Sequence, residues 1–309
     1  MLLMPIRNLV ILGPTATGKT SLSLKLSNFI KAEIINSDAS LFYKELTIGT
    51  GKPSLDELNE VSHHLVNFLD PKQRYSLSEF IDEANKLIEI IKGKKKIPII
   101  VGGSGQYLKA LIENWDVSKI KPDYKLRTKL NNEVKEYGVD YLFNKLNKEF
   151  PENSKYIDAK NPRRVIRAFE LGLMGKNVSR KKTPSKHKFF KVGLTMPREI
   201  LYERIDARIK IMFENNWVGE VEGLIKKGLT KNLNSFSSIG YNEIYDHLVN
   251  DLDLEEAINL IKKRTRNLVR HQYNWFKLND PDIKWFDSSK NDLDHIVNEI
   301  LEEKIEYKI

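Results

Sequence analysis

Residues 8–20, Asn8-Leu9-Val10-Ile11-Leu12-Gly13-Pro14-Thr15-Ala16-Thr17-Gly18-Lys19-Thr20, join an apolar run to a loop bounded by two glycines. The spacing G-x-x-x-x-G-K-T lets successive backbone N–H groups surround phosphate oxygens, while Lys19 adds a positive charge and Thr20 a hydroxyl for Mg²⁺. The residues that follow, 21–30, carry leucines at helical spacing, so the N-terminus of a helix would face the same phosphates. This unit predicts a site for a di- or triphosphate, formed by Gly13, Pro14, Thr15, Ala16, Thr17, Gly18, Lys19 and Thr20.

The composition of the chain is that of a globular protein without membrane helices. It has 309 residues, of which 40% are hydrophobic and 30% charged. No run of 18 or more apolar residues occurs, so we expect no membrane span. Cysteine is absent, which excludes disulfides, thiolate zinc sites and a cysteine nucleophile. The apolar residues before Gly13 lead directly into the phosphate loop, so we interpret them as a buried strand rather than a signal peptide. Together these features favour the cytoplasm.

The distribution of positive charge suggests a polyanionic partner. The formal net charge is +9. The run from Arg180 to Lys191 contains no acidic residue, and neither does the run from Ile261 to Arg270. Two local basic clusters favour binding to nucleic acid. The alternative is that they are solvated faces of helices.

The first half of the chain alternates short apolar runs with amphipathic stretches, which indicates βα units and a mainly parallel sheet. We expect strands at 8–12, 32–38, 97–101, 190–196 and 283–286, and helices at 21–30, 78–92, 197–227 and 254–275. Residues 121–147 and 161–173 read as lysine-rich helices without a strand between them, and Asn161-Pro162 suits the start of the second. The prediction is an α/β fold, a P-loop NTPase-like parallel sheet flanked by helices, with a helical insertion domain. The core would be residues 1–115 and 190–309, and the insertion 116–189.

One acidic residue is placed to act beside the phosphate loop. Asp38 closes the predicted second strand, and ligands of open α/β sheets bind at the carboxyl ends of the strands. We therefore expect Asp38 in the cleft as a magnesium ligand or general base. Its alternative role is to cap the turn after the strand. The strand at 97–101 ends in Gly102 and Gly103, so it lacks the second acid that an NTPase would use for its metal.

Further motifs follow the loop in a characteristic order. They are Ser37-Asp38, Tyr43-Lys44, Ile48-Gly49-Thr50-Gly51-Lys52-Pro53, His63-His64-Leu65, Val101-Gly102-Gly103-Ser104-Gly105-Gln106-Tyr107, Asn161-Pro162-Arg163-Arg164-Val165-Ile166-Arg167-Ala168, Ile239-Gly240-Tyr241, and Arg270, Gln272 and Trp275-Phe276. With the loop itself, this pattern resembles the tRNA dimethylallyltransferase family (tRNA isopentenyltransferase, IPP transferase) of bacterial type. The resemblance runs from residue 8 to about residue 278.

The resemblance implies a reaction. Members of the family transfer the dimethylallyl group of dimethylallyl diphosphate to the exocyclic amine of the adenosine that lies 3′ of the anticodon in tRNA, with Mg²⁺. On this interpretation the loop holds the diphosphate of the prenyl donor, and Thr20 contacts the metal. Thr15 would lie near the bridging oxygen, Arg208 would contact the pyrophosphate, and Asp38 would take the proton of the amine.

The resemblance also implies contacts to the anticodon stem-loop of tRNA. The residues concerned are Asp38, Ala39, Ser40, Leu41, Ser104, Arg163, Arg164, Arg167, Ser238, Ile239, Gly240, Tyr241, Arg266 and Arg270. Arg163 with Arg167, and Arg266 with Arg270, are spaced i, i+4 on a helix and can follow a phosphate backbone. The alternative is that they pair with acids on neighbouring helices. We expect a monomer without a membrane partner.

The chain departs from the family pattern at several positions. Leu41 stands where the family usually has a glutamine, so it does not offer the hydrogen bonds to a base edge that an amide would make. Thr47, Gln106 and His271 also differ from the usual residues. His63-His64 lacks a third ligand at suitable spacing, so we assign the pair a packing or turn role rather than a metal site.

Three other functions remain open at this point. An isopentenyltransferase that acts on free adenine nucleotides would share the loop and the donor, but it would have little use for the insertion or the basic helix at 261–270. A P-loop nucleotide kinase or ATPase would need the second acid. A non-catalytic RNA-binding protein would explain the charge and leave Lys19 and Asp38 without a role.

Overall fold

The computed structural model describes residues 8–179, 182 and 185–302. Two compact units divide the chain: Met1–Glu113 with Ser185–Ile309 form the first, and Asn114–Pro184 the second. The predicted insertion, residues 116–189, overlaps the second unit. Arg180, Lys181, Thr183 and Pro184, which belong to the first predicted basic run, lie outside the described residues, as do the first seven residues of the chain.

The first unit is built on a parallel sheet. The described strands are β1 (Asn8–Leu12), β2 (Ala32–Asn36), β3 (His63–His64), β4 (Ile97–Val101), β5 (Phe189–Thr195) and β6 (Ile283–Asp287), in the order β3-β2-β4-β1-β5-β6. Every residue of β1 and of β4 is buried. Strands that are covered on both faces have this continuous apolar sequence, which is why they could be predicted with their correct bounds.

The register of three strands brings their carboxyl ends together. Ile11 is paired with Val101, and Val101 with Asn36. Backbone bonds continue just past the strands, from Gly102 N–H to the Ile11 carbonyl at 3.3 Å and from Ser37 N–H to the Val101 carbonyl at 2.7 Å. The phosphate loop after β1, the Ser37-Asp38 segment after β2 and the Gly102-Gly103 turn after β4 therefore lie side by side.

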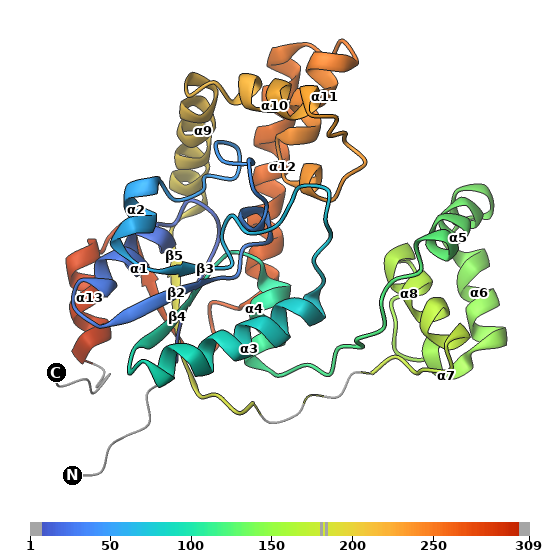
Figure 1. Cartoon of the computed structure of the whole chain (residues 1–309), viewed down its shortest axis with the longest axis horizontal. Helices are drawn as coiled ribbons and strands as arrows, with labels where there is room; N and C mark the ends of the chain where they lie inside the picture. The colour runs from blue at the N-terminus through green and yellow to red at the C-terminus, as the bar shows by residue number, and fades with distance from the viewer. Residues whose placement is uncertain (1–7, 180–181, 183–184, 303–309) are drawn as a thin grey trace. The chain divides into compact units, whose positions relative to one another are not determined.

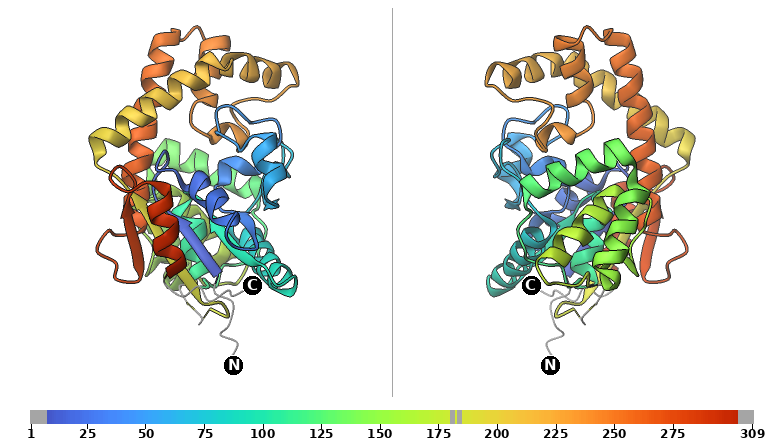
Figure 2. Two further views of the ribbon diagram at one scale, coloured as in Figure 1. Left: turned by 90° about the vertical axis from the view of Figure 1, so that its left-hand side faces the viewer. Right: turned by 90° about the vertical axis from the view of Figure 1, so that its right-hand side faces the viewer.

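Helices cover both faces of the sheet. On one face α1 (Lys19–Ser27) and α13 (Leu293–Glu302) pack together, and their buried leucines and isoleucines share one core with alternate residues of β1 and β4. On the other face lie α3 (Leu77–Gly93) and α4 (Gly105–Ile112), and α4 packs against α12 (Leu254–Trp275). Helices α9 (Arg198–Glu214), α10 (Trp217–Lys226) and α11 (Tyr241–Val249) gather with part of α12 beyond one end of the sheet (Figures 1 and 2). Short elements are α2 (Leu55–Glu60) and the 3₁₀ turns η1 (Ala39–Phe42) and η2 (Ser235–Ser237).

Several predicted bounds were wrong for local reasons. The helix predicted at 197–227 is divided into α9 and α10 by Asn216, whose φ of 66° lies in the left-handed region and starts the second helix. The second strand ends at Asn36 rather than at Asp38, because Asp38 caps η1. The edge strand β3 was missed, since two residues leave no periodic signal in a sequence. The last long helix, Leu254–Trp275, was predicted correctly.

The second unit is a group of helices, α5 (Tyr124–Tyr137), α6 (Val139–Glu149), α7 (Pro151–Ser154) and α8 (Pro162–Leu173). Gly138, with a φ of 86°, breaks the single helix predicted at 121–147. Asn161 caps α8, as predicted, by accepting a bond from Arg164 N–H. Leu130, Leu142, Leu146, Val165 and Phe169 form the core of this unit. Among all described residues, no helix is both long and apolar enough to cross a membrane.

Candidate active site

The phosphate loop is held in shape by its own residues. Gly13 and Gly18 have φ values of 137° and 92°, which favour glycine, and Gly18 lies at the start of α1. The Pro14 carbonyl accepts bonds from Thr17 Oγ1 at 2.9 Å and from Lys19 Nζ at 2.6 Å. A β-carbon on Gly13 would come within 2.3 Å of the Leu194 carbonyl oxygen, so β5 fixes the position of the first glycine. The loop therefore has the curved backbone that a phosphate cradle needs.

Three charged side chains act on one another across the carboxyl end of the sheet. Burial lowers the pKa of Lys19 to about 8, the negative charge of Asp38 opposes this shift, and Arg208 adds to it. Burial also lowers the pKa of Arg208, again against the charge of Asp38. An anion bound between these two cations would stabilise their charged forms. The electrostatics of the cleft therefore favour a polyphosphate between Lys19 and Arg208.

Asp38 is fixed by bonds to its backbone and to one carboxylate oxygen. Its N–H donates to Asn36 Oδ1 at 2.8 Å, and its carbonyl accepts from Asn36 Nδ2 at 3.0 Å. Its Oδ1 accepts from the backbone N–H of Ser40 at 3.1 Å and from the Ser40 hydroxyl at 2.7 Å. The structure thus shows the capping role that the sequence left as an alternative. Its other oxygen, Oδ2, lies beside Gly103, 3.4 Å from where a β-carbon of that glycine would be. One oxygen therefore holds the turn, and the second is left for chemistry.

Arg208 projects from α9 onto the loop that follows η1. A β-carbon on Gly51 would lie 1.7 Å from Arg208 Nη2, so the guanidinium rests directly on that backbone. The loop is fixed at its other end by Glu220, whose Oε2 accepts from the N–H groups of Thr47 and Ile48 at 3.0 and 2.7 Å. This segment therefore determines where Arg208 lies.

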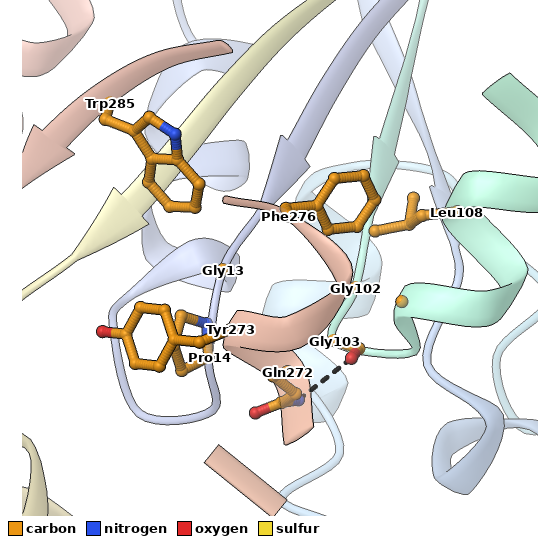
Figure 3. Close-up of a pocket in the computed structure, with 10 residues that line it drawn as sticks. Gly13, Pro14, Gly102, Gly103, Leu108, Gln272, Tyr273, Phe276 and Trp285 are labelled. Carbon is orange, nitrogen blue, oxygen red and sulfur yellow. Dashed lines mark hydrogen bonds between the residues drawn. The ribbon is translucent and has the colours of Figure 1, made fainter. Parts of the chain in front are cut away.

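Gln272 of α12 is the residue of the site to which the sequence assigned no role. Its Oε1 accepts from Thr15 N–H at 2.9 Å, and its Nε2 donates to the Gly103 carbonyl at 3.0 Å, the bond drawn in Figure 3. The available signal was its place in the closing motif with Arg270 and Trp275. The cavity beside it, lined also by Pro14 and Phe276, has a volume of only about 10 Å³, the room of one water molecule. A prenyl group does not fit there.

The predicted tRNA-binding residues of the first unit fall into two groups. Ala39, Ser40, Leu41 and Ser104 are partly exposed at the cleft, and Ser104 Oγ accepts from Ala39 N–H at 3.1 Å; Ser238 and Ile239 are partly exposed before α11. Tyr241 is wholly buried and its hydroxyl donates to Glu220 at 2.7 Å, while Gly240 is buried against the ring of Trp217. In this structure Tyr241 and Gly240 therefore anchor α11 and Glu220, and their contact with tRNA stays a prediction.

The arginines predicted to bind tRNA differ in whether they already bond to other residues of the protein. Arg163 and Arg164 are exposed on α8. Arg167 forms an ion pair with Glu170 and donates to the Ile120 carbonyl at 3.0 Å; Glu170 is buried and is shared with Arg127 at 2.7 Å. Arg167 is therefore held by an acid of its own helix, whereas the alternative interpretation expected acids on neighbouring helices, and its side chain stays partly exposed.

On α12, Arg266 pairs with Asp206 at 2.6 Å, while Arg270 donates to Asn267 and is exposed. Both lie around a cavity of about 440 Å³ between α9 and α12, which is also lined by Lys262 and Lys263. Arg266 is thus partly neutralised by its acid, whereas the cavity as a whole remains strongly basic.

No group of three or more His, Asp or Glu side chains is placed to hold a metal ion in the described part of the chain. His64 instead bonds to Glu33 at 2.8 Å, which agrees with the structural role expected for that pair. The Thr20 side chain is exposed at the start of α1. This donor set fits a divalent cation only if phosphate oxygens of a substrate supply further ligands, which is how Mg²⁺ is usually bound.

Comparison with known proteins gives consistent results. The family model described as IPP transferase matches residues 41–279. The chain is 39% identical to a tRNA dimethylallyltransferase of Dictyoglomus turgidum, over 93% of this chain and 89% of that protein. It is also 39% identical to a tRNA dimethylallyltransferase of Carboxydothermus hydrogenoformans, over 96% of each chain.

Two solved structures are similar over almost the whole chain. A tRNA isopentenylpyrophosphate transferase from Bacillus halodurans has a TM-score of 0.72 at 35% identity, covering 97% of this chain and 95% of its own. A eukaryotic dimethylallyltransferase acting on tRNA has a TM-score of 0.79 at 28% identity, covering 97% of this chain and 78% of its own. The predicted fold class, a P-loop NTPase-like parallel sheet flanked by helices, is confirmed.

Proposed function

This chain belongs to the IPP transferase family, and from that premise we propose that it transfers the dimethylallyl group of dimethylallyl diphosphate to the exocyclic amine of an adenosine in tRNA. The adenosine is the one 3′ of the anticodon. The products are an isopentenyladenosine in the tRNA and diphosphate. The second unit and the basic helix α12 would contact the anticodon stem-loop.

The observation that carries the proposal is that the carboxylate of Asp38 acts on the lysine of the phosphate loop. The charge of Asp38 acts on both Lys19 and Arg208, so a base and two cations share one cleft. A P-loop kinase or ATPase needs a further acid at the end of a neighbouring strand, but β4 is followed by Gly102 and Gly103. The arrangement suits a reaction in which a proton is taken from a nucleophile while pyrophosphate leaves.

The protein's part in that reaction follows from the charges. The N6 atom of adenine bonds to C1 of the dimethylallyl group as the bond from C1 to the diphosphate oxygen breaks. Loop N–H groups, Lys19 and Arg208 stabilise the negative charge that grows on the diphosphate. The free Oδ2 of Asp38 accepts the proton that N6 loses, a step worth on the order of 10²–10⁴ in rate.

We propose that the donor's diphosphate is bound together with Mg²⁺. The Thr20 hydroxyl would be the chain's own ligand, and the metal would supply additional positive charge against the leaving group. Thr15 is proposed to lie near the bridging oxygen, since its backbone is fixed by Gln272.

Transfer requires the adenosine to leave the stack of the anticodon loop, at a cost of roughly a few kcal/mol. Contacts to the RNA backbone must offset this cost. We propose that Arg163 and Arg164 of the second unit and Arg270 of the first supply them, because their side chains are exposed. Since the substrate is tRNA, the reaction would take place in the cytoplasm; a monomeric state stays a prediction.

The test is to incubate the protein with labelled dimethylallyl diphosphate and Mg²⁺ and offer either unmodified tRNA or AMP. We expect label in tRNA and none in AMP. Transfer to AMP alone would identify the enzyme of free nucleotides, and ATP hydrolysis without prenyl transfer would identify an ATPase. Binding of tRNA without any transfer would leave only the RNA-binding alternative.

A further inference from the structure

We propose that Gln272 is a positioning residue of the transfer reaction: its side-chain amide ties the loop that binds the diphosphate to the turn beside the base Asp38. The inference rests on the proposed function. It concerns the distance between leaving group and base rather than the binding of either substrate.

The first support is the pair of bonds that one side chain makes. Gln272 Oε1 accepts from Thr15 N–H at 2.9 Å. Its Nε2 donates to the Gly103 carbonyl at 3.0 Å, the bond drawn in Figure 3. Thr15 follows β1 and Gly103 follows β4, so the amide joins the ends of two neighbouring strands. A carboxamide offers a donor group and an acceptor group side by side at the end of a flexible stem, without carrying charge.

The second support is the position of Asp38 relative to the same amide. The point where a β-carbon of Gly103 would be lies 2.5 Å from Gln272 Nε2 and 3.4 Å from Asp38 Oδ2. The amide and the free carboxylate oxygen thus both lie on the side of Gly103 where a side chain would project. A movement of Gln272 would loosen the turn that lies beside Asp38.

The third support is the tight packing around the amide. Gln272 is 9% exposed, and the neighbouring cavity holds about 10 Å³. A buried side chain with both polar atoms bonded and no room to turn is held in one rotamer. The opposite side of α12 carries exposed Arg270, so Gln272 belongs to the inward face of that helix.

These contacts give an expected size of effect. Without the amide, the phosphate loop at Thr15 and the turn at Gly103 would keep their fold, but each could shift by a fraction of an ångström. A displacement of about 1 Å between reacting groups costs on the order of 10² in rate. The effect should therefore be on the chemical step, because the Lys19, Arg208 and backbone groups proposed to bind the diphosphate are unchanged.

The experiment compares Gln272→Met, which keeps the length but removes both bonds, with Gln272→Glu, which keeps an acceptor for Thr15 but sets a negative charge against the Gly103 carbonyl and the leaving group. The matched control is Gln106→Met, a glutamine exposed on α4. For each variant we would measure the rate of single-turnover transfer to tRNA, the dissociation constant of dimethylallyl diphosphate and the melting temperature. The rate assay and the binding assay are both run well below the melting temperature.

We expect Gln272→Met to transfer about 10–100-fold more slowly with nearly unchanged donor affinity. Gln272→Glu should be slower still, and Gln106→Met should match the wild type. Wild-type rates in Gln272→Met, or a loss confined to donor affinity, would overturn the positioning role. Failure of both Gln272 variants to fold would also overturn it, since the residue would then serve stability alone. Absence of transfer by the wild-type protein would instead refute the proposed function.

Discussion

The guanidinium of Arg208 lies on the backbone of Gly51, so closely that a β-carbon added to this glycine would meet Arg208 Nη2 at 1.7 Å. Gly51 also has a φ of 59°, which favours glycine. The two residues are far apart in sequence, yet the position of the proposed pyrophosphate arginine depends on the absence of a side chain in the loop.

We therefore predict that Gly51→Ala lowers the rate of prenyl transfer in the same direction as Arg208→Ala. The methyl group would displace the guanidinium, and removal of one such electrostatic interaction costs on the order of 10²–10³ in rate. The control is Gly223→Ala in α10, where no atom lies within 4 Å of the added carbon, so activity should be kept. Normal transfer by Gly51→Ala would show that Arg208 does not depend on this glycine.

Asp38→Asn should retain donor binding and reduce the transfer rate by about 10²–10⁴, because the amide cannot accept the proton of the adenine amine. Donor binding by calorimetry and single-turnover transfer measure the two effects separately. Ser40→Ala serves as the comparison, since it removes only the hydroxyl bond to Oδ1 and leaves the backbone bond. Equal rates for Asp38→Asn and the wild type would remove Asp38 from the mechanism.

Affinity for dimethylallyl diphosphate should weaken above pH 8. Burial lowers the pKa of Lys19 to about 8, so in the free enzyme the ammonium loses its proton there rather than near 10.5. Below this pH the charged form is present and binds the diphosphate; above it, binding must first restore the proton. The dissociation constant measured from about pH 7 to about pH 9.5 tests this expectation. Lys19→Met should bind the donor weakly and show no such rise.

Stability should fall in acid because of Glu33. Burial opposes its ionisation, but hydrogen bonds from Lys96, His64 and Lys94 outweigh burial and lower its pKa to about 2. A carboxyl with a depressed folded-state pKa stabilises fully above its unfolded value of 4.5, and the contribution disappears as pH falls towards 2. Glu33→Gln should cost about 1–3 kcal/mol at neutral pH and show a weaker acid dependence of urea unfolding. An unchanged acid dependence would contradict this account.

The arginines of α8 should separate into two classes. Replacing Arg163 and Arg164 together by alanine should weaken tRNA binding and make it less sensitive to salt, by about one unit of slope for each phosphate that is no longer neutralised. The melting temperature should change little. Arg167→Ala should instead lower the stability of the second unit by about 1–3 kcal/mol, because only one of two arginines would still pair with buried Glu170.

Filter binding at several salt concentrations and thermal melting distinguish these two classes of arginine. The reverse pattern would mean that Arg167 contacts RNA and that the exposed pair does not.

The sequence by itself determined the central strands of the sheet and the phosphate loop, since both depend on local patterns, but not the short edge strand β3. The apolar runs at 8–12 and 97–101 are buried on both faces, and the loop glycines Gly13 and Gly18 have the positive φ values that favour glycine. Asp38 could be placed at the cleft because strands of a parallel sheet end on one edge, and the ordered motifs identified the family.

Only the tertiary structure decided which polar side chains meet. Gln272 bonds to Thr15, 257 positions away in the sequence. Arg208 contacts Gly51, which also lies far from it in the sequence. The burial of Tyr241 and the pairing of Arg167 with Glu170 were likewise not predictable from the sequence, and the tRNA contacts assigned to both residues stay predictions. A sequence shows the donors and acceptors of each residue, whereas burial and the choice of partner arise when distant segments pack together. The phosphate loop could therefore be predicted from the sequence, whereas the interactions that align it with Asp38 could not.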